Sequence, residues 1–538
     1  MNSETDFLTF LNQELSNALK NQADYHGEME KMLEFYKYSA FYPKKTGDRR
    51  DSTDTQENLL RVYADKNIHF TSKFPTIKVP TAGRTPQERE AASVREKILL
   101  ATWRLSGGKA LQRKWAFDGT IFSAAIAETC FDFQSRKVYV KRYDPRYCVW
   151  QMSDSNELRV EAFWAVFPIS KQECIDLYGV APTGNTIPMD GISSEYFKSI
   201  DGKEWFMQAI RWDASYRSVW VGNQIVEEPH KHGFDFIPVD ICTPFYDGET
   251  NGRGGFYLRP MVNPQANLNL TLARRDSIVK RMAHPVLWGR GIVGRQFDEV
   301  KESIKSGGGG MVGLKQGGEL GILQLSDTSL LDTHAAEYRA QMLRLSGFSA
   351  AAMGELAGAN TSGDALGMYF TPTQRHIENQ NIAWISFYES INAKILRAYE
   401  IFGLLDEQFT LEGVSPRSTI ISLGEGDSAK YGKDLAGSNY SVKFTNAVIN
   451  KKYTSVVEMP AVTPKNELEE KRLVVEAVAQ KFMSRTTAFE LYGIESPEDE
   501  LNLLTQEQMN PALNPAGMAQ MVAAATATNP KALPAGGK

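Results

Sequence analysis

The stretch RPMVNPQANLNLTLARRDSIVKRM, residues 259–282, decides how the chain is interpreted. Apolar residues recur along it at spacings of three, four and seven, which predicts one helix about 36 Å long. This stripe consists of Met261, Leu268, Leu272, Val279 and Met282. Five basic residues stand against Asp276 alone, so the helix carries a local charge of +4. A long basic helix is therefore the first element to explain.

A second long helix is predicted over residues 329–345, and it stops at Ser346-Gly347 as helices stop at glycine. His284-Pro285 ends the first helix. Between the two, residues 286–325 alternate short strands, a helix around 295–305 and glycine clusters. Two long helices thus bracket a compact α/β insert.

The remainder of the chain mixes helices and strands. Runs of β-branched and aromatic residues predict a mixed, largely antiparallel sheet region over residues 130–246. Thr85-Pro86-Gln87-Glu88 predicts a capped start for the helix at 86–105. Helices are also predicted at 3–40 with an interruption near Gly27, at 109–127, at 373–402 opened or kinked by Pro372, and at 465–483 and 485–492. Residues 408–448 are β-like, residues 347–363 form an ordered or mobile loop, and the tail from 509 should be disordered.

Composition excludes several classes of protein. The 538 residues carry 60 Lys and Arg against 65 Asp and Glu, a net charge of −5, so bulk charge does not hold the chain to nucleic acid. No apolar run reaches the roughly 18 residues of a membrane span, and an acidic N-terminus argues against a secretory signal. The four cysteines form no C-x-x-C pair, and His230 and His232 have no third ligand nearby, so no metal site is predicted.

One motif points to a cofactor. Gly289-Arg290-Gly291-Ile292-Val293-Gly294 matches the dinucleotide fingerprint and follows a strand-like run. Further βα pairs of a dinucleotide fold are missing around it, so the glycines read better as tight turns. A nicotinamide-dependent oxidoreductase built on residues 286–320 stays as an alternative. No other short catalytic motif is found, and no enzyme activity and no cofactor are predicted.

The basic helix has two interpretations. Arg274 and Arg281 lie seven residues apart and share a helix face, which is either a solvated face or a face presented to a DNA duplex. A monomeric DNA-binding module is the corresponding alternative function. Residues 466–508 carry ten acids against four bases and should avoid nucleic acid.

The order of elements resembles the portal proteins of tailed bacteriophages. Several short segments are similar too: Tyr143-Asp144-Pro145-Arg146 after a strand, residues 260–269 at the start of the basic helix, and His284-Pro285 at its exit. Further segments are Thr361-Ser362-Gly363-Asp364-Ala365-Leu366, residues 484–490 and residues 493–498. The resemblance spans nearly the whole chain.

The resemblance implies an α+β, mainly helical ring subunit with wing, stem, clip and crown. It assigns the wing to residues 1–258, the stem helices to 259–282 and 329–346, the clip to 283–328, the tunnel loop to 347–372, a long helix returning to the wing to 373–455, the crown to 456–508 and a disordered tail to 509–538.

The resemblance also implies a function: a dodecameric ring at one capsid vertex of the virion, assembled in the host cytoplasm. Double-stranded DNA would pass through it during terminase-driven packaging and ejection. The implied partners are other copies of the chain, DNA, terminase, the major capsid and scaffolding proteins, and head–tail adaptor or tail proteins, without a membrane. ATPase activity would belong to the terminase.

Candidate contact residues follow from these assignments. A ring multiplies each basic side chain by its copy number, so one arginine per subunit becomes a ring of positive charge. The candidates are Arg274, Arg275, Lys280 and Arg281 for the DNA-facing stem, Met353, Glu355, Leu356, Asn360 and Thr361 for the tunnel loop, and Arg290, Arg295 and Lys315 for docking at the clip.

Overall fold

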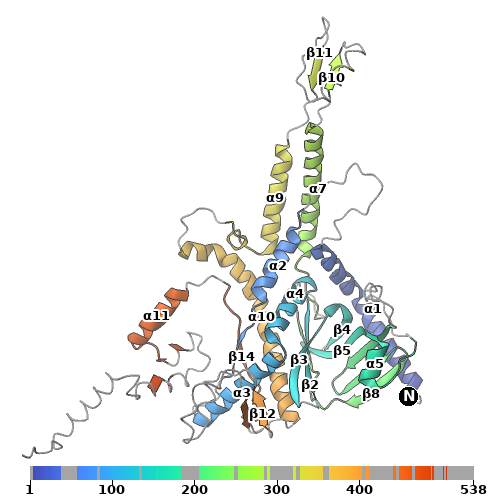
Figure 1. Cartoon of the computed structure of the whole chain (residues 1–538), viewed down its shortest axis with the longest axis vertical. Helices are drawn as coiled ribbons and strands as arrows, with labels where there is room; N and C mark the ends of the chain where they lie inside the picture. The colour runs from blue at the N-terminus through green and yellow to red at the C-terminus, as the bar shows by residue number, and fades with distance from the viewer. Residues whose placement is uncertain are drawn as a thin grey trace, which may run out of the picture. The chain divides into compact units, whose positions relative to one another are not determined.

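The computed structural model shows a mixed α+β protein, as predicted (Figure 1). The structure describes residues 4–37, 57–80, 85–132, 136–153, 156–184, 205–246, 252–283, 287–290, 298, 319–322, 328–355, 363–402, 408–411, 440–443, 448–462, 467–485, 488–489, 501 and 504–505. The chain divides into two compact units. The first unit comprises residues 1–73, 109–128 and 142–387, and the second unit comprises residues 74–108, 129–141 and 388–538.

A five-stranded antiparallel sheet in the order β4-β5-β6-β7-β8 organises the body of the first unit. Its strands are β4 (Cys148–Ser153), β5 (Asn156–Ser170), β6 (Trp205–Trp212), β7 (Tyr216–Val221) and β8 (Gln224–Lys231). The predicted antiparallel sheet within residues 130–246 is confirmed.

Helices cover both faces of this sheet. On one face α1 (Glu4–Lys37) buries Leu15 and Leu19 against Trp164 and Trp220. On the other face α5 (Lys171–Tyr178) packs Cys174 against Ile169 and Val221. Successive residues of a strand point to opposite faces, which is why neighbours in β7 serve different helices.

The predicted interruption of the first helix near Gly27 is wrong, because α1 is continuous. Its buried stripe runs straight past the glycine, from Tyr25 to Met29 and Leu33. A mid-helix glycine costs about 1 kcal/mol. Burying one large apolar side chain gains about 1.5–3 kcal/mol, so the continuous helix is favoured.

The helix predicted at 109–127 ends earlier than expected. It is α4 (Gly108–Ile121), and Ala125 already begins β2 (Ala125–Asp132). Ser123 between them has a φ of 64°, a left-handed conformation that stops the helix, and its hydroxyl donates to the Gly255 carbonyl at 2.7 Å. β2 lies between β3 (Lys137–Tyr143) and β9 (Val239–Cys242) in a three-stranded sheet.

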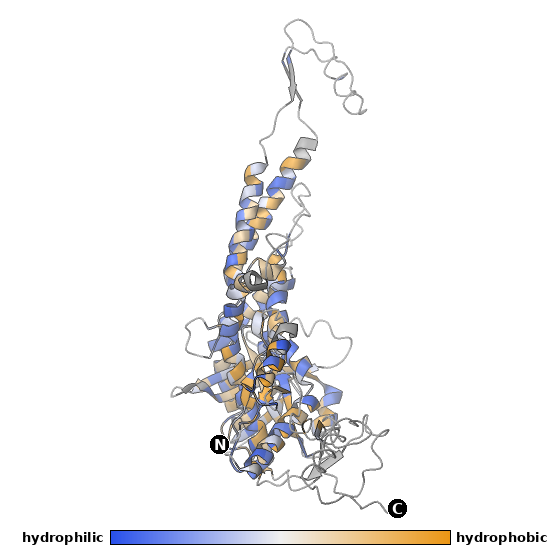
Figure 2. Cartoon of the chain, turned by 90° about the vertical axis from the view of Figure 1, so that its left-hand side faces the viewer, coloured by the Kyte–Doolittle hydropathy of each residue, from blue (hydrophilic) through white to orange (hydrophobic). Residues whose placement is uncertain are grey.

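Two long helices form an antiparallel pair, α7 (Arg259–Ala283) and α9 (Ser329–Ser346), which lie side by side in Figures 1 and 2. The helices predicted at 259–282 and 329–345 are confirmed to within one residue. Between them in the chain, β10 (Leu287–Arg290) pairs antiparallel with β11 (Glu319–Ile322). The chain leaves α7 into β10 and enters α9 after β11, so this hairpin belongs to the outer end of the pair.

The next helix, α10 (Gly363–Ile401), begins about ten residues before the position predicted from Pro372. The loop predicted from composition, 347–363, ends where α10 begins, whereas the tunnel loop that the resemblance assigns, 347–372, reaches into the helix. Proline at position 372 cannot donate to the Met368 carbonyl, but Met368 is 77% exposed, so water can satisfy that carbonyl. The helix therefore tolerates the proline.

The second unit joins α3 (Pro86–Leu105) to residues 388–401 of α10. The Trp103 indole donates to the Asn392 side chain at 2.8 Å, and Thr102 lies 3.2 Å from the Tyr399 hydroxyl. Thr85 caps α3 as predicted. The remaining elements are β1 (Thr76–Lys78) with β14 (Val456–Glu458), β12 (Gln408–Leu411) with β13 (Tyr440–Lys443), and α11 (Glu467–Ala479).

The predicted tail from 509 and most of the predicted helix at 485–492 lie outside the described residues. Among the helices that the structure describes, none is both long and apolar enough to span a membrane.

Candidate functional site

The site with a predicted function is the α7–α9 pair. Met261, Leu268 and Leu272 are buried on one face of α7, as the sequence stripe predicts. Val279, nearer the outer end, is 49% exposed although it belongs to the same stripe. Burial of this face therefore decreases toward the outer end of the pair.

A polar clamp around Glu57 fastens the inner part of the pair to the start of α2 (Leu59–Thr71). The fully buried Gln265 donates to the Glu57 carbonyl at 2.6 Å and accepts from the Leu59 amide at 3.0 Å. Arg339 of α9 donates through both Nε and Nη2 to the Glu57 carboxylate, with the Nε contact at 2.9 Å. Glu57 thus bonds to α7 through its backbone carbonyl and to α9 through its carboxylate.

Two adjacent arginines on α7 have different surroundings. Arg275 forms an ion pair with Asp332 of α9 at 2.9 Å, so its charge is balanced within the chain. Arg274 is exposed, and among the described residues no carboxylate is paired with it. Of the two, Arg274 is the better candidate for an external anion.

Arg274 belongs to an outward face of α7. Asn263, Asn267, Leu270 and Arg274 are all exposed and recur at helical spacing. Arg281 follows Arg274 by seven residues and so has the same helix register. The backbone of Lys280 and Arg281 belongs to α7, but their side chains lie outside the described part of the structure.

α9 has an outward face of its own. Leu330, Glu337 and Arg344 recur every seven residues and are exposed, as is Leu345. Figure 2 shows hydrophobic as well as hydrophilic residues along both helices of the pair. The pair consequently presents two chemically different surfaces that nothing in the described chain covers.

The clip candidates are described only in part. Arg290 is exposed at the end of β10, opposite Glu319 of β11. Arg295 and Lys315 lie outside the described residues. Gly289 of the dinucleotide-like motif lies in β10, which pairs antiparallel with β11, whereas the dinucleotide fold places this strand in a mostly parallel sheet. Gly291 and Gly294 are not among the described residues.

The loop candidates divide in the same way. Met353 is half-buried in a short 3₁₀ turn, η3 (Ala351–Met353), and Glu355 is exposed just after it. Leu356, Asn360 and Thr361 lie outside the described residues. Residues 347–355 are a packed segment, with the Phe348 ring 5.9 Å from Phe70 and 5.5 Å from His376 between centroids.

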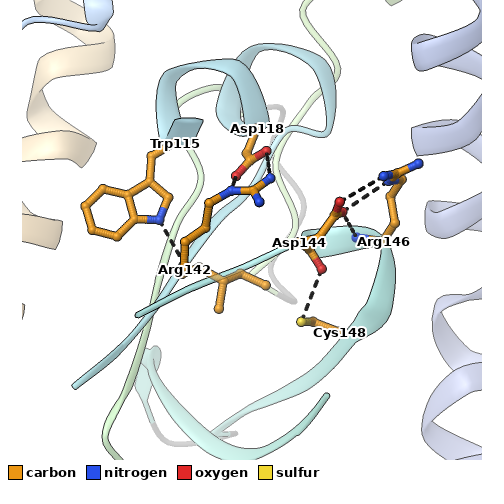
Figure 3. Close-up of polar contacts among 7 residues, drawn as sticks. Trp115, Asp118, Arg142, Asp144, Arg146 and Cys148 are labelled. Carbon is orange, nitrogen blue, oxygen red and sulfur yellow. Dashed lines mark hydrogen bonds and ion pairs between the residues drawn. The ribbon is translucent and has the colours of Figure 1, made fainter. Parts of the chain in front are cut away.

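The motif Tyr143-Asp144-Pro145-Arg146 has a structural role (Figure 3). Arg142, directly before it, donates twice to Asp118, each bond 2.5 Å long. Arg146 pairs with Asp144 at 2.8 Å and lies over the Phe122 ring. Complete burial raises the pKa of Asp118 to about 7, against the opposing effect of Arg142. These pairs tie α4 and β3 to the 3₁₀ turn η2 (Pro145–Tyr147).

Sequence reasoning missed Glu57, Gln265, Arg339 and His376. Each acts through partners far away in the chain; Glu57 and Gln265, for example, are 208 positions apart. Helical periodicity could identify Gln265 only as a polar residue on a buried face, which is itself an indication of a buried partner.

No protein-family model and no curated protein matches this chain.

Proposed function

We propose that this chain is the subunit of a portal ring in a tailed bacteriophage, a channel at one capsid vertex for double-stranded DNA. The observation that carries the proposal is the antiparallel α7–α9 pair. The two helices flank the β10–β11 hairpin in the chain, and each has an outward face that no described residue covers. Its place in the chain is where the resembling family has its stem and clip.

In this proposal α7 and α9 are the stem, β10 and β11 belong to the clip, and the sheet body with α1 is part of the wing. α11 belongs to the crown. Terminase and later the adaptor or tail proteins would dock at the clip, and capsid and scaffolding proteins at the wing.

The two outward faces suit a ring. Closed rings use heterologous contacts, in which one surface of a subunit meets a different surface of the next. The outward face of α7 carries the exposed Leu270, and that of α9 carries the exposed Leu330 and Leu345, so they are distinct surfaces with apolar side chains that a neighbouring subunit would bury. About twelve copies would give a particle near 720 kDa from subunits of 60.1 kDa.

The charge distribution suits a conduit. DNA that must slide needs weak phosphate contacts that salt screens and that ignore sequence. One arginine per subunit that has no carboxylate partner among the described residues, repeated around a ring, supplies such contacts without tight binding. We assign this role to Arg274, and by register to Arg281, while Arg275 holds α7 to α9.

Charge reversal tests the assignment. Particles assembled with Arg274→Glu should form normally and contain less DNA, because a repulsive ring replaces an attractive one. Arg275→Glu is the matched control on the adjacent residue, and it should affect the stability of the pair more than DNA content. Equal DNA content in the Arg274→Glu and parent particles would contradict the conduit role.

The two alternative functions make separate predictions. A nicotinamide enzyme would be stabilised by about 2.7 kcal/mol when NAD is present at a hundred times its dissociation constant, which a thermal shift detects. A monomeric DNA-binding module would bind a short duplex tightly with a steep salt dependence, and Arg274→Glu would abolish that binding.

A further inference from the structure

The segment that follows α9, residues 347–355, is seated directly on α10. Gly347 ends α9 with a φ of +76°, a left-handed conformation that glycine adopts without strain. A Cβ atom at this position would lie 2.5 Å from Nδ1 of His376, closer than atoms approach without moving. Gly347 is therefore required both by the turn and by its contact with His376.

Thr373, three residues before His376, fastens the segment by hydrogen bonds. Its Oγ1 is fully buried, accepts from the Ser349 amide at 2.9 Å and lies 3.1 Å from the Ser349 hydroxyl. The Ser349 hydroxyl in turn accepts from the Ala352 amide at 3.3 Å. The Thr373 hydroxyl can donate to Ser349 Oγ, so its hydrogen has a partner as well as its lone pair.

The positions of Met353 and Glu355 follow from that of Ser349. The Met353 amide donates to the Ser349 and Ala350 carbonyls at 3.3 and 3.0 Å, and the Glu355 amide donates to the Ala350 carbonyl at 2.9 Å. Gly354 reverses the chain between them with a φ of +89°. The turn is thus closed on itself and attached to α10 through Ser349.

His376 is held from the other side by buried polar groups of the first unit. Gln380 Nε2 donates to His376 Nε2 at 3.0 Å and to Asn67 Oδ1 at 2.9 Å. Asn67 donates to Thr120 at 2.9 Å. His376 Nε2 is therefore an acceptor, which places the ring proton on Nδ1 and fixes the imidazole that supports Gly347.

We propose that Thr373 and His376 form a latch that holds residues 347–355 on α10. In the portal reading, on which this role rests, the latch fixes Met353 and Glu355 at the start of the tunnel loop. Thr373 is then a positioning residue, because it touches no DNA and acts through Ser349.

Amide hydrogen exchange on the full chain tests the latch. Thr373→Val keeps the side-chain volume but removes the hydroxyl, and exchange of the Ser349 and Ala352 amides should become about tenfold faster. Thr373→Ser should restore the parent rate. Thr371→Val is the matched control, because the Thr371 hydroxyl bonds only within α10, to the Gly367 carbonyl at 3.3 Å. It should leave the rate unchanged.

Unchanged exchange in Thr373→Val, or equal acceleration in Thr371→Val, overturns the latch. Ser349→Ala provides a second approach if Thr373→Val does not fold, because it removes the other hydroxyl at a half-buried site. It should accelerate exchange of the Ala352 amide, and an unchanged rate overturns the latch as well.

DNA content of assembled particles tests the positioning role separately. We expect Thr373→Val rings to have the parent mass but an altered amount of packaged DNA, with Thr373→Ser at the parent amount. Faster exchange with unaltered DNA content overturns the positioning role. If the parent chain forms no ring, the portal proposal fails, and the exchange result alone decides on the latch.

Discussion

α1 and α7 are both long helices with an apolar stripe, but the stripe of α1 is buried in the body, whereas the pair of α7 and α9 leaves large apolar side chains exposed. Leu11, Leu15 and Leu19 of α1 are at most 1% exposed against the sheet. On the α7–α9 pair, Leu270 and Leu330 are 49% and 65% exposed. The apolar stripe of α1 is thus buried within one chain, whereas the pair has exposed apolar side chains that a second molecule can bury.

The pair itself has two unlike ends. Its inner part is held by the buried Gln265, by the Glu57 clamp, and by a bond of 2.9 Å from the Tyr257 hydroxyl to the Ser346 carbonyl. Toward the outer end, the described contact is the exposed pair of Arg275 and Asp332. The inner part of the pair is therefore held by buried polar contacts, whereas the ion pair toward the outer end is exposed to solvent.

The largest expected effect comes from the body. Leu15→Ala should lower the free energy of unfolding by about 2–5 kcal/mol, because it opens a cavity beside Trp164 and Trp220. Urea denaturation followed by tryptophan fluorescence measures this loss. Leu270→Ala is the matched substitution on the pair and should change unfolding by less than about 0.5 kcal/mol. Equal losses would remove the contrast between body and pair.

Gln265→Leu should cost about 2–4 kcal/mol. It leaves the Leu59 amide and the Glu57 carbonyl without their partner, and each unsatisfied group costs about 1–3 kcal/mol. Asn267→Leu, the same chemical change at an exposed position of the helix, should be nearly neutral. The two variants are compared by chemical denaturation. Similar losses would show that the clamp does not stabilise the inner end.

Acidification should destabilise the inner end of the α7–α9 pair through His376. Burial lowers the pKa of His376 from 6.5 to about 4, so on acidification the unfolded chain takes up the proton first. Stability from this group is complete above pH 6.5 and is lost between pH 6.5 and 4, by up to about 1.4 kcal/mol per pH unit. The difference in unfolding free energy between the parent and His376→Gln should shrink or reverse over this interval. A difference independent of pH would contradict it.

The smallest effect is expected at the outer end. Arg275→Ala should lower stability by about 0–1 kcal/mol, because the ion pair with Asp332 is solvent-exposed. The loss should decrease at high salt, which screens the pair in the parent. Thermal unfolding at low and high salt measures it. A loss as large as that of Gln265→Leu would mean that contacts at the inner and outer ends stabilise the α7–α9 pair to the same degree.

The sequence predicts what depends on local pattern. The ends of α7, α9 and the capped start of α3 follow from helical spacing and from Thr85, because these signals lie within a few residues. Gly27 misleads, because burial of the apolar residues around it outweighs the cost of a glycine within a helix. Pro372 misleads about where α10 begins, because water can satisfy the carbonyl of the exposed Met368 that the proline leaves without a donor.

The contacts of Glu57 and the seat of Gly347 on His376 could not be predicted, because they join segments distant in the chain. The candidate arginines illustrate both cases. Periodicity identifies Arg274 and Arg275 as basic residues of one helix. Only the position of Asp332 on α9 separates the paired arginine from the open one.

The most direct test of the account is the molar mass of the purified chain by size-exclusion chromatography with light scattering, combined with end-on electron micrographs. We expect a closed ring with a central hole and a mass of about 720 kDa, twelve times the 60.1 kDa subunit. A particle of 60 kDa that stays monomeric across protein and salt concentrations would contradict it.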